Sequence, residues 1–152
     1  MIEQLDELYR DVILDHFKNS SHHGELAGAE IKVQGANPLC GDEMTFFLTL
    51  RDGRIDQARF IGKGCAISQA AASMLAAQLE HRTITEATTI IEAMKGLMQG
   101  REPDPSVDIG DLEALAGVRK FPVRVKCAAL SWNVVEQGLK EYANGPHRTT
   151  SP

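Results

Sequence analysis

The segment NPLCGD, residues 37–42, places a thiol and a carboxylate two positions apart with a glycine between them. Pro38 fixes its own φ angle and biases the residue before it towards an extended conformation. Gly41 allows backbone angles that a side chain would forbid. We therefore expect a tight, exposed loop from which Cys40 and Asp42 point at one object.

Two further cysteines complete the thiols of the chain. Cys65 follows the glycine-framed triplet GKG at 62–64, and Cys127 ends the segment RVKC at 124–127. Three thiolates and one carboxylate are enough to close a four-coordinate metal site, and this donor set is compatible with Zn²⁺. The alternative is that these cysteines are small buried hydrophobic residues, as lone cysteines usually are. The wide spacing leaves both interpretations open, and the glycine frames favour a metal site.

Composition narrows the class of protein. A chain of 152 residues suits one domain that buries most of its apolar surface. Hydrophobic residues at 43% and charged residues at 24% are ordinary for a globular protein. The net charge is -5 and no basic block is present, so nucleic acid is not expected as a partner.

The ends of the chain and its cysteines predict where it acts. The acidic start argues against a secretory signal, and no apolar run is long enough to span a bilayer. An odd number of cysteines without a signal peptide indicates reduced thiols rather than a disulfide framework. We therefore expect a cytoplasmic protein with no membrane partner.

The first half of the chain predicts one helix and a small sheet. Apolar residues at helical spacing predict an amphipathic helix over about 2–19. The adjacent His22 and His23 that follow are expected to be solvated. Strands are expected over 29–34, 44–50 and 55–61, and Asp52-Gly53 is a strong hairpin signal between the last two. Three antiparallel strands with one buried face follow from this pattern.

The second half predicts helices. One is expected over 66–79, and a capping-box pattern at Thr83 and Glu86 opens another that ends near Met98. Residues 100–111 are expected to form a loop, 112–115 one helical turn, and 123–144 the last helix. The fold class is therefore α+β, a three-stranded antiparallel sheet with helices packed on one face. Residues 1–144 are expected to form a single domain, with 145–152 a disordered tail.

These elements bring the cysteines together. Cys40 lies between two strands, Cys65 begins a helix and Cys127 lies in the first turns of the last helix, so all three are expected at one end of the sheet. With Asp42 they form the predicted metal site. Arg124 shares a helix face with Cys127 if the last helix has already begun there, and the alternative is a surface arginine.

The motifs also resemble a known family. The segments NPLCGD at 37–42, GKGCAIS at 62–68 and KC at 126–127, with LYRDVILDH at 8–16, are similar to the U-type iron-sulfur cluster assembly proteins, the IscU, SufU and NifU N-terminal family. The resemblance runs from about residue 8 to residue 142. It implies the same fold that the patterns predict.

Two branches of that family differ at the third cysteine. IscU-type scaffolds carry histidine before it, whereas Lys126 and the insertion-like segment 100–117 resemble the SufU-type branch. That resemblance implies a zinc-dependent sulfurtransferase that takes persulfide sulfur from a SufS-type cysteine desulfurase and passes it to downstream iron-sulfur assembly proteins. The alternative is a scaffold holding transient iron or a [2Fe-2S] cluster.

The resemblance also assigns roles to residues. It implies zinc bound by Cys40, Asp42, Cys65 and Cys127, with a desulfurase histidine replacing Cys40 when the partner docks. Cys40 is the predicted sulfur acceptor because its Pro/Gly loop is expected to be the most mobile of the three. Arg124 is predicted to be the second catalytic residue, which steadies the released Cys40 thiolate or grips the desulfurase.

Overall fold

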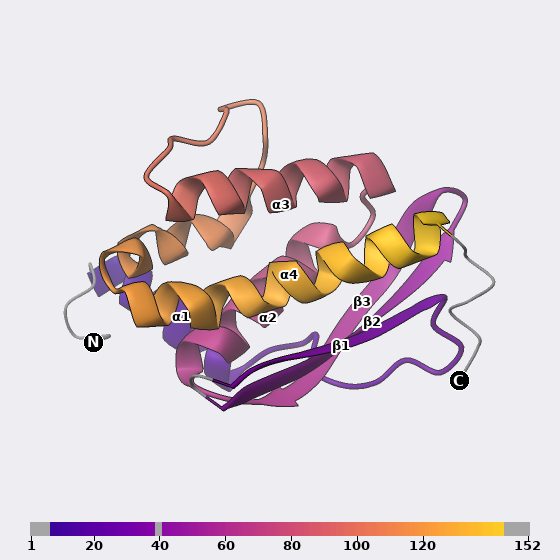
Figure 1. Cartoon of the computed structure of the whole chain (residues 1–152), viewed down its shortest axis with the longest axis horizontal. Coiled ribbons are helices and arrows are strands. Elements are labelled where there is room, and N and C mark those ends of the chain that lie inside the picture. The colour runs from indigo at the N-terminus through magenta and orange to yellow at the C-terminus, as the bar shows by residue number, and fades with distance from the viewer. Residues whose placement is uncertain (1–6, 39–40, 145–152) are drawn as a thin grey trace.

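The structure is a computed structural model that describes residues 7–38 and 41–144. Within these ranges the chain runs through one helix, three strands and then four further helices (Figure 1). Their order is α1 (Glu7–Lys18), β1 (Ile31–Asn37), β2 (Asp42–Arg51), β3 (Arg54–Lys63), α2 (Ala66–Leu79), α3 (Ile84–Met98), the 3-10 helix η2 (Gly110–Lys120) and α4 (Pro122–Asn144). The predicted tail at 145–152 lies outside the described residues.

The three strands form one antiparallel sheet in the order β1-β2-β3. Asn37 pairs with Asp42 at one end of the β1-β2 ladder, and Glu43 pairs with Lys63 in the β2-β3 ladder. The β2-β3 turn is built from Asp52 and Gly53, which have φ angles of 54° and 77°. Two consecutive positive φ angles match the right-handed twist of a hairpin, so the turn predicted from the sequence is confirmed.

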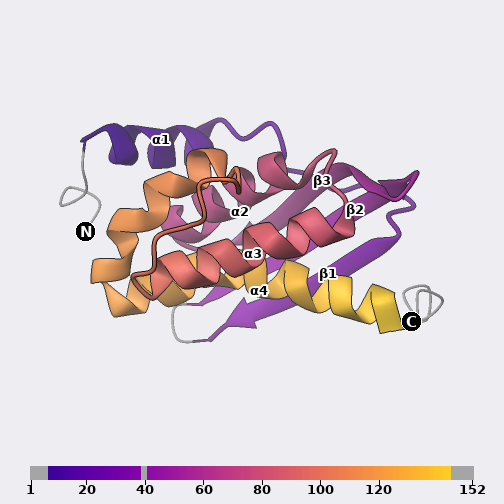
Figure 2. The same ribbon diagram turned by 90° about the horizontal axis from the view of Figure 1, so that it is seen from above.

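The helices gather on one side of the sheet, with α2 and α4 packed against it (Figures 1 and 2). The largest buried side chains at this interface include Phe46, Phe60 and Trp132. Helix α2 has the predicted bounds, and its small residues let it lie in the middle of the core. The capping box at the start of α3 is present, since the Thr83 hydroxyl accepts the Glu86 N–H at 3.1 Å and the Glu86 carboxylate accepts the Thr83 N–H at 2.9 Å. The predicted α+β architecture is confirmed.

The segment before α4 differs from its prediction. One helical turn was expected over 112–115, but η2 runs from Gly110 to Lys120. Leu112, Leu115 and Val118 are all buried and three residues apart. A 3-10 helix has three residues per turn, so residues three apart lie on the same face. A pattern based on α-helical spacing therefore identifies only part of this helix.

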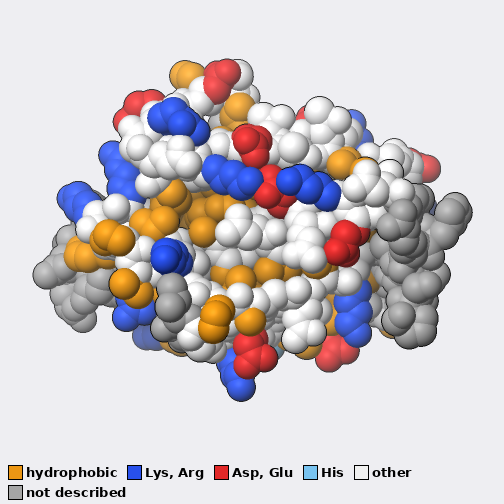
Figure 3. Space-filling model, in the orientation of Figure 1, with side chains coloured by type: hydrophobic (Ala, Val, Ile, Leu, Met, Phe, Trp, Pro, Cys, Tyr) orange, Lys and Arg blue, Asp and Glu red, His pale blue; other side chains and the backbone are white. Residues whose placement is uncertain are grey.

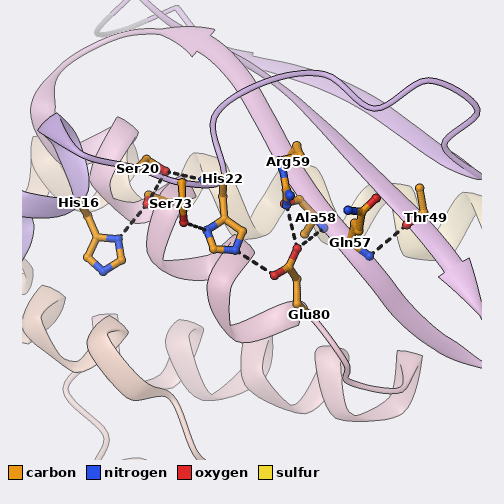
Figure 4. Close-up of polar contacts among 10 residues, drawn as sticks. His16, Ser20, His22, Thr49, Gln57, Ala58, Arg59, Ser73 and Glu80 are labelled. Atoms are coloured by element: carbon orange, nitrogen blue, oxygen red, sulfur yellow. Dashed lines mark hydrogen bonds and ion pairs between the residues drawn. The ribbon is translucent and has the colours of Figure 1, made fainter.

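A polar network joins the segment after α1 to the sheet and to the end of α2 (Figure 4). His22 Nε2 lies 2.9 Å from Glu80 Oε1, and Arg59 donates to Glu80 Oε2 at 2.8 Å. Backbone bonds between Phe60 and residues 22 and 24 continue the contact along the edge of β3. The expectation that His22 is solvated is therefore wrong, because its ring is 16% exposed and pairs with a carboxylate 58 positions away.

The surface carries charges of both signs. Over α3 and α4, Figure 3 shows acidic and basic side chains interspersed, and Lys95 and Glu136 form an ion pair at 2.7 Å between the two helices. Among the residues described, no helix is both long and apolar enough to cross a membrane.

Candidate metal centre

Three potential metal ligands converge at one end of the sheet. One carboxylate oxygen of Asp42 and the sulfur atoms of Cys65 and Cys127 all lie within 4.8 Å of one another. They come from the start of β2, the N-cap of α2 and the second turn of α4, which Figure 1 places together at the left end of the molecule. Segments far apart in sequence thus supply one carboxylate and two thiols to a single point.

Asp42 is buried rather than exposed. Its side chain is the first of β2 and is only 1% exposed, so the expectation of an exposed loop is wrong for this residue. Its Oδ1 accepts the backbone N–H of Cys65 at 3.1 Å. The carboxylate is drawn inward because it satisfies an amide at the N-terminus of α2, where N–H groups have no partner within the helix.

The two cysteines are held by their helices. Cys65 is the N-cap residue of α2, and its carbonyl accepts the Ser68 hydroxyl at 3.0 Å. Cys127 is fully buried, and its thiol donates to the Val123 carbonyl at 3.5 Å. Cys65 thus directly precedes α2, and Cys127 lies within α4.

Arg124 lies against both thiols. Helix α4 has begun by this residue, so Arg124 and Cys127 share a face as the sequence predicted. Burial acts to lower the pKa of Arg124, but the negative charge of Cys65 and of Cys127, and hydrogen bonds to both, raise it above its ordinary value. Arg124 is half-buried, and its charged guanidinium lies beside the two sulfur atoms.

The structure brings together three of the four predicted ligands. Cys40, the fourth ligand and predicted sulfur acceptor, lies outside the described residues. Asp42, two positions further along the chain, is the predicted ligand nearest to Cys40 in sequence. The hydrogen bond between the Asp42 carboxylate and the Cys65 amide was not predicted from the sequence, because a sequence pattern does not indicate which backbone N–H group a carboxylate will accept.

The donor set fits a tetrahedral zinc ion. Zinc-sulfur bonds of about 2.3 Å and zinc-oxygen bonds of about 2.0–2.2 Å separate neighbouring ligand atoms by about 3.5–3.8 Å in a tetrahedron. The three donor atoms already lie within 4.8 Å, so a small contraction brings them to that spacing. Mg²⁺ and Ca²⁺ bind oxygen ligands in preference to sulfur, so a site with two thiolates is not expected to prefer either ion.

Comparison with known protein families finds a match over most of the chain. The NifU-like N terminal domain family matches residues 8–128 of the chain. The chain belongs to this family. The match begins in α1 and ends one residue past Cys127, so it includes all three converging ligands and Arg124.

Individual relatives of the NifU-like N-terminal domain cover nearly the whole chain. A Bacillus subtilis protein named zinc-dependent sulfurtransferase SufU is 43% identical, over 93% of this chain and 95% of the relative. A Streptococcus pyogenes protein named iron-sulfur cluster assembly scaffold protein IscU is 37% identical, over 97% and 92%. The crystal structure of FiSufU from Fervidobacterium islandicum superposes with a TM-score of 0.81 at 33% identity, over 85% of this chain and 94% of that one.

Proposed function

We propose that this chain is a zinc-dependent sulfurtransferase. It accepts persulfide sulfur from a SufS-type cysteine desulfurase and passes the sulfur on for iron-sulfur cluster assembly. The observation that carries the proposal is the convergence of Asp42, Cys65 and Cys127 beside the guanidinium of Arg124. The 43% identity to a relative named zinc-dependent sulfurtransferase supports the same assignment.

The ligands of the proposed zinc site are Cys40, Asp42, Cys65 and Cys127. Bound zinc would keep the cysteine sulfurs deprotonated near neutral pH. Three thiolates and one carboxylate carry four negative charges against two on zinc. Arg124 offsets part of the difference, because it already contacts Cys65 and Cys127.

Each residue of the site has a separate task. Cys65 and Cys127 are anchored on α2 and α4, and Asp42 is buried at the start of β2, so these three hold their positions. Cys40 is the ligand proposed to leave, since it lies between Pro38 and Gly41 on a connection between strands. Arg124 is proposed to stabilise the freed Cys40 thiolate, because a guanidinium stays charged and donates several hydrogen bonds at once.

The proposed chemical step is a thiol-persulfide exchange. The Cys40 thiolate attacks the outer sulfur of the desulfurase persulfide, a bond forms between Cys40 Sγ and that sulfur, and the sulfur-sulfur bond of the donor breaks. The desulfurase cysteine leaves as a thiolate and Cys40 becomes the persulfide. No external oxidant or reductant is needed, since one zero-valent sulfur atom changes carrier.

A groove beside the site offers room for an approaching partner. It has a volume of about 270 Å³ and lies between the end of β1 and α4. Lys126 and Asn133 on α4 and Asn37 and Pro38 near the end of β1 are among its lining residues. Because Pro38 is two positions before Cys40 in the sequence, we propose that a partner bound in this groove delivers its sulfur to that cysteine.

The second candidate function is a scaffold on which a [2Fe-2S] cluster is assembled. The relative named IscU scaffold from Streptococcus pyogenes, 37% identical, favours it. Thiolates serve iron-sulfur clusters as well as zinc. Lys126 and the segment 100–117, which resemble the SufU-type pattern, favour the sulfurtransferase.

A coupled assay tests the proposal. The zinc-loaded chain is incubated with a SufS-type cysteine desulfurase and cysteine, and alanine release is measured with and without it. We expect the chain to accelerate turnover and to acquire persulfide. Unchanged alanine release, together with formation of a stable [2Fe-2S] cluster when iron is supplied, would favour the scaffold function instead.

A further inference from the structure

A glycine lies directly between two of the converging ligands. Gly64 follows the last residue of β3 and precedes Cys65. A Cβ atom at this position would lie 2.8 Å from the carboxylate carbon of Asp42 and 2.6 Å from Ser68 Oγ, and closer still to Asp42 Oδ1. Ordinary contact between carbon atoms begins near about 3.5 Å, so a methyl group does not fit here.

The backbone on both sides of the contact is fixed by the sheet. Asp42 pairs with Asn37 of β1, and the next residue, Glu43, pairs with Lys63 of β3. Gly64 follows Lys63 immediately, so the same β2-β3 ladder holds both main chains. A side chain at 64 must therefore displace the Asp42 carboxylate or the adjoining Cys65, and each of these supplies a donor atom.

The Asp42 carboxylate has little room to retreat. Its side chain is 1% exposed, and Oδ1 is held by the Cys65 amide. The Ser68 hydroxyl can move by rotating about χ1, at the cost of its bond to the Cys65 carbonyl. The carboxylate has no such escape into solvent, so the collision is relieved mainly by moving a metal ligand.

We propose that Gly64 is a positioning residue for the metal centre. The missing side chain at 64 lets the Asp42 carboxylate reach the Cys65 amide, so that Oδ1 accepts that N–H while a carboxylate oxygen stays within 4.8 Å of the two thiols. This inference rests on the proposed zinc centre. It adds that the geometry of the centre depends on a residue that contributes no ligand atom.

Replacing Gly64 also strains the backbone, so the experiment needs a control variant with similar strain and no collision. Gly64 has a φ of +157°, which disfavours any L residue, so Gly64→Ala combines strain with the collision. Gly24 has a φ of +141° and no heavy atom within 4 Å of its Cβ position. Gly24→Ala therefore carries the strain without a collision, and the difference between the two variants reports the effect on Asp42.

The test is zinc affinity, measured by competition with a chromophoric chelator. Groups that orient metal ligands typically contribute about 10–100-fold to affinity, and we expect Gly64→Ala to weaken zinc binding by that factor. Gly24→Ala is expected to leave the zinc affinity close to that of the unaltered chain, because its added methyl group meets no other atom within 4 Å. An affinity for Gly64→Ala as high as that of Gly24→Ala would overturn the proposal.

A double-mutant cycle isolates the contact. Asp42→Gly removes the carboxylate, and Cys40, Cys65 and Cys127 remain as donors. In that background, Gly64→Ala is expected to cost no more affinity than Gly24→Ala does, because the backbone strain remains but the collision with the carboxylate is gone. Of the three atoms nearest to the added methyl group, only the rotatable Ser68 Oγ is left. Equal losses in both backgrounds would show that Gly64 acts independently of Asp42, and the proposal would be wrong.

Melting temperatures of the metal-free proteins test the proposal if a variant fails to fold or if the chain binds no zinc. If Gly64→Ala alone fails to fold, we expect Asp42→Gly to restore folding, and a failure to do so would contradict the proposal. An unaltered chain that binds no zinc would contradict the proposed zinc centre instead. The steric claim would still be tested then, because metal-free Gly64→Ala should melt below metal-free Gly24→Ala.

Discussion

Asp42, at the start of β2, is proposed both to accept a hydrogen bond and to bind a metal ion, and replacing it by asparagine or by alanine separates these two roles. Oδ1 accepts the Cys65 N–H at 3.1 Å. Asparagine keeps a carbonyl oxygen that can accept this bond, whereas alanine leaves the amide without it. Both replacements remove the anionic oxygen that is offered to a metal ion. The pair therefore distinguishes the hydrogen bond from the metal ligand.

The size of the effect follows from burial. An amide left without its partner costs about 1–3 kcal/mol when buried, and the half-buried Cys65 places this bond at the lower end, about 1–2 kcal/mol. For a chain of this length, each kcal/mol lowers Tm by about 2–4 °C. Metal-free Asp42→Ala should therefore melt about 2–8 °C below the unaltered chain, and metal-free Asp42→Asn should melt close to it.

With zinc bound, Asp42→Asn should no longer melt close to the unaltered chain. Both variants lose a zinc ligand. When zinc is present in excess, each tenfold loss of zinc affinity removes about 1.4 kcal/mol from the free energy by which zinc stabilises the folded protein. Thermal unfolding followed by circular dichroism, with chelator and with zinc, measures both effects on one preparation. A metal-free Asp42→Ala that melts like the unaltered chain would refute the hydrogen-bond argument. A zinc-induced rise in Tm for Asp42→Asn as large as that of the unaltered chain would refute the ligand assignment.

Three further predictions concern sulfur transfer and acid stability. After reaction with desulfurase and cysteine, mass mapping should find persulfide on Cys40, and Cys40→Ala should abolish stimulation of the desulfurase; sulfur found mainly on Cys65 or Cys127 would overturn this assignment. Arg124→Ala should keep its zinc and its circular dichroism spectrum but lose most sulfur transfer, whereas loss of zinc would show that Arg124 is structural. Burial acts to raise the pKa of Glu80, but hydrogen bonds from the Ala58 amide, His22 and Arg59 hold it below the ordinary value of 4.5. A depressed folded-state pKa contributes stability above the unfolded value and loses it as pH falls through the folded value. Glu80→Gln should therefore lower Tm at pH 7, and its difference from the unaltered chain should shrink below about pH 4.5; a constant difference down to pH 3 would contradict this.

Much of the fold was predictable because local chemistry decides it. The Asp52-Gly53 pair accepts two positive φ angles, and the Thr83 and Glu86 pair closes a capping box, whatever surrounds them. The 3-10 helix η2 was underestimated because its buried residues repeat every third position. An amphipathic α-helix repeats less regularly, at three and four positions, so the search template did not fit.

The candidate site was predictable in its residues and only partly in its geometry. Glycine frames and element order were enough to place Asp42, Cys65 and Cys127 at one end of the sheet. They did not show that Asp42 is buried, because that depends on an amide contributed by a helix 23 positions later. The role of Gly64 was also hidden, since it depends on which side chain faces the space that glycine leaves open.

The most direct test of the account is the metal content of the protein purified anaerobically from its own host. Zinc and iron are measured by elemental analysis alongside the protein concentration. We expect about one zinc ion per chain and little iron, because three thiolates and one carboxylate close a tetrahedral zinc site. Tightly bound iron with negligible zinc would contradict the zinc-dependent sulfurtransferase and favour the cluster scaffold.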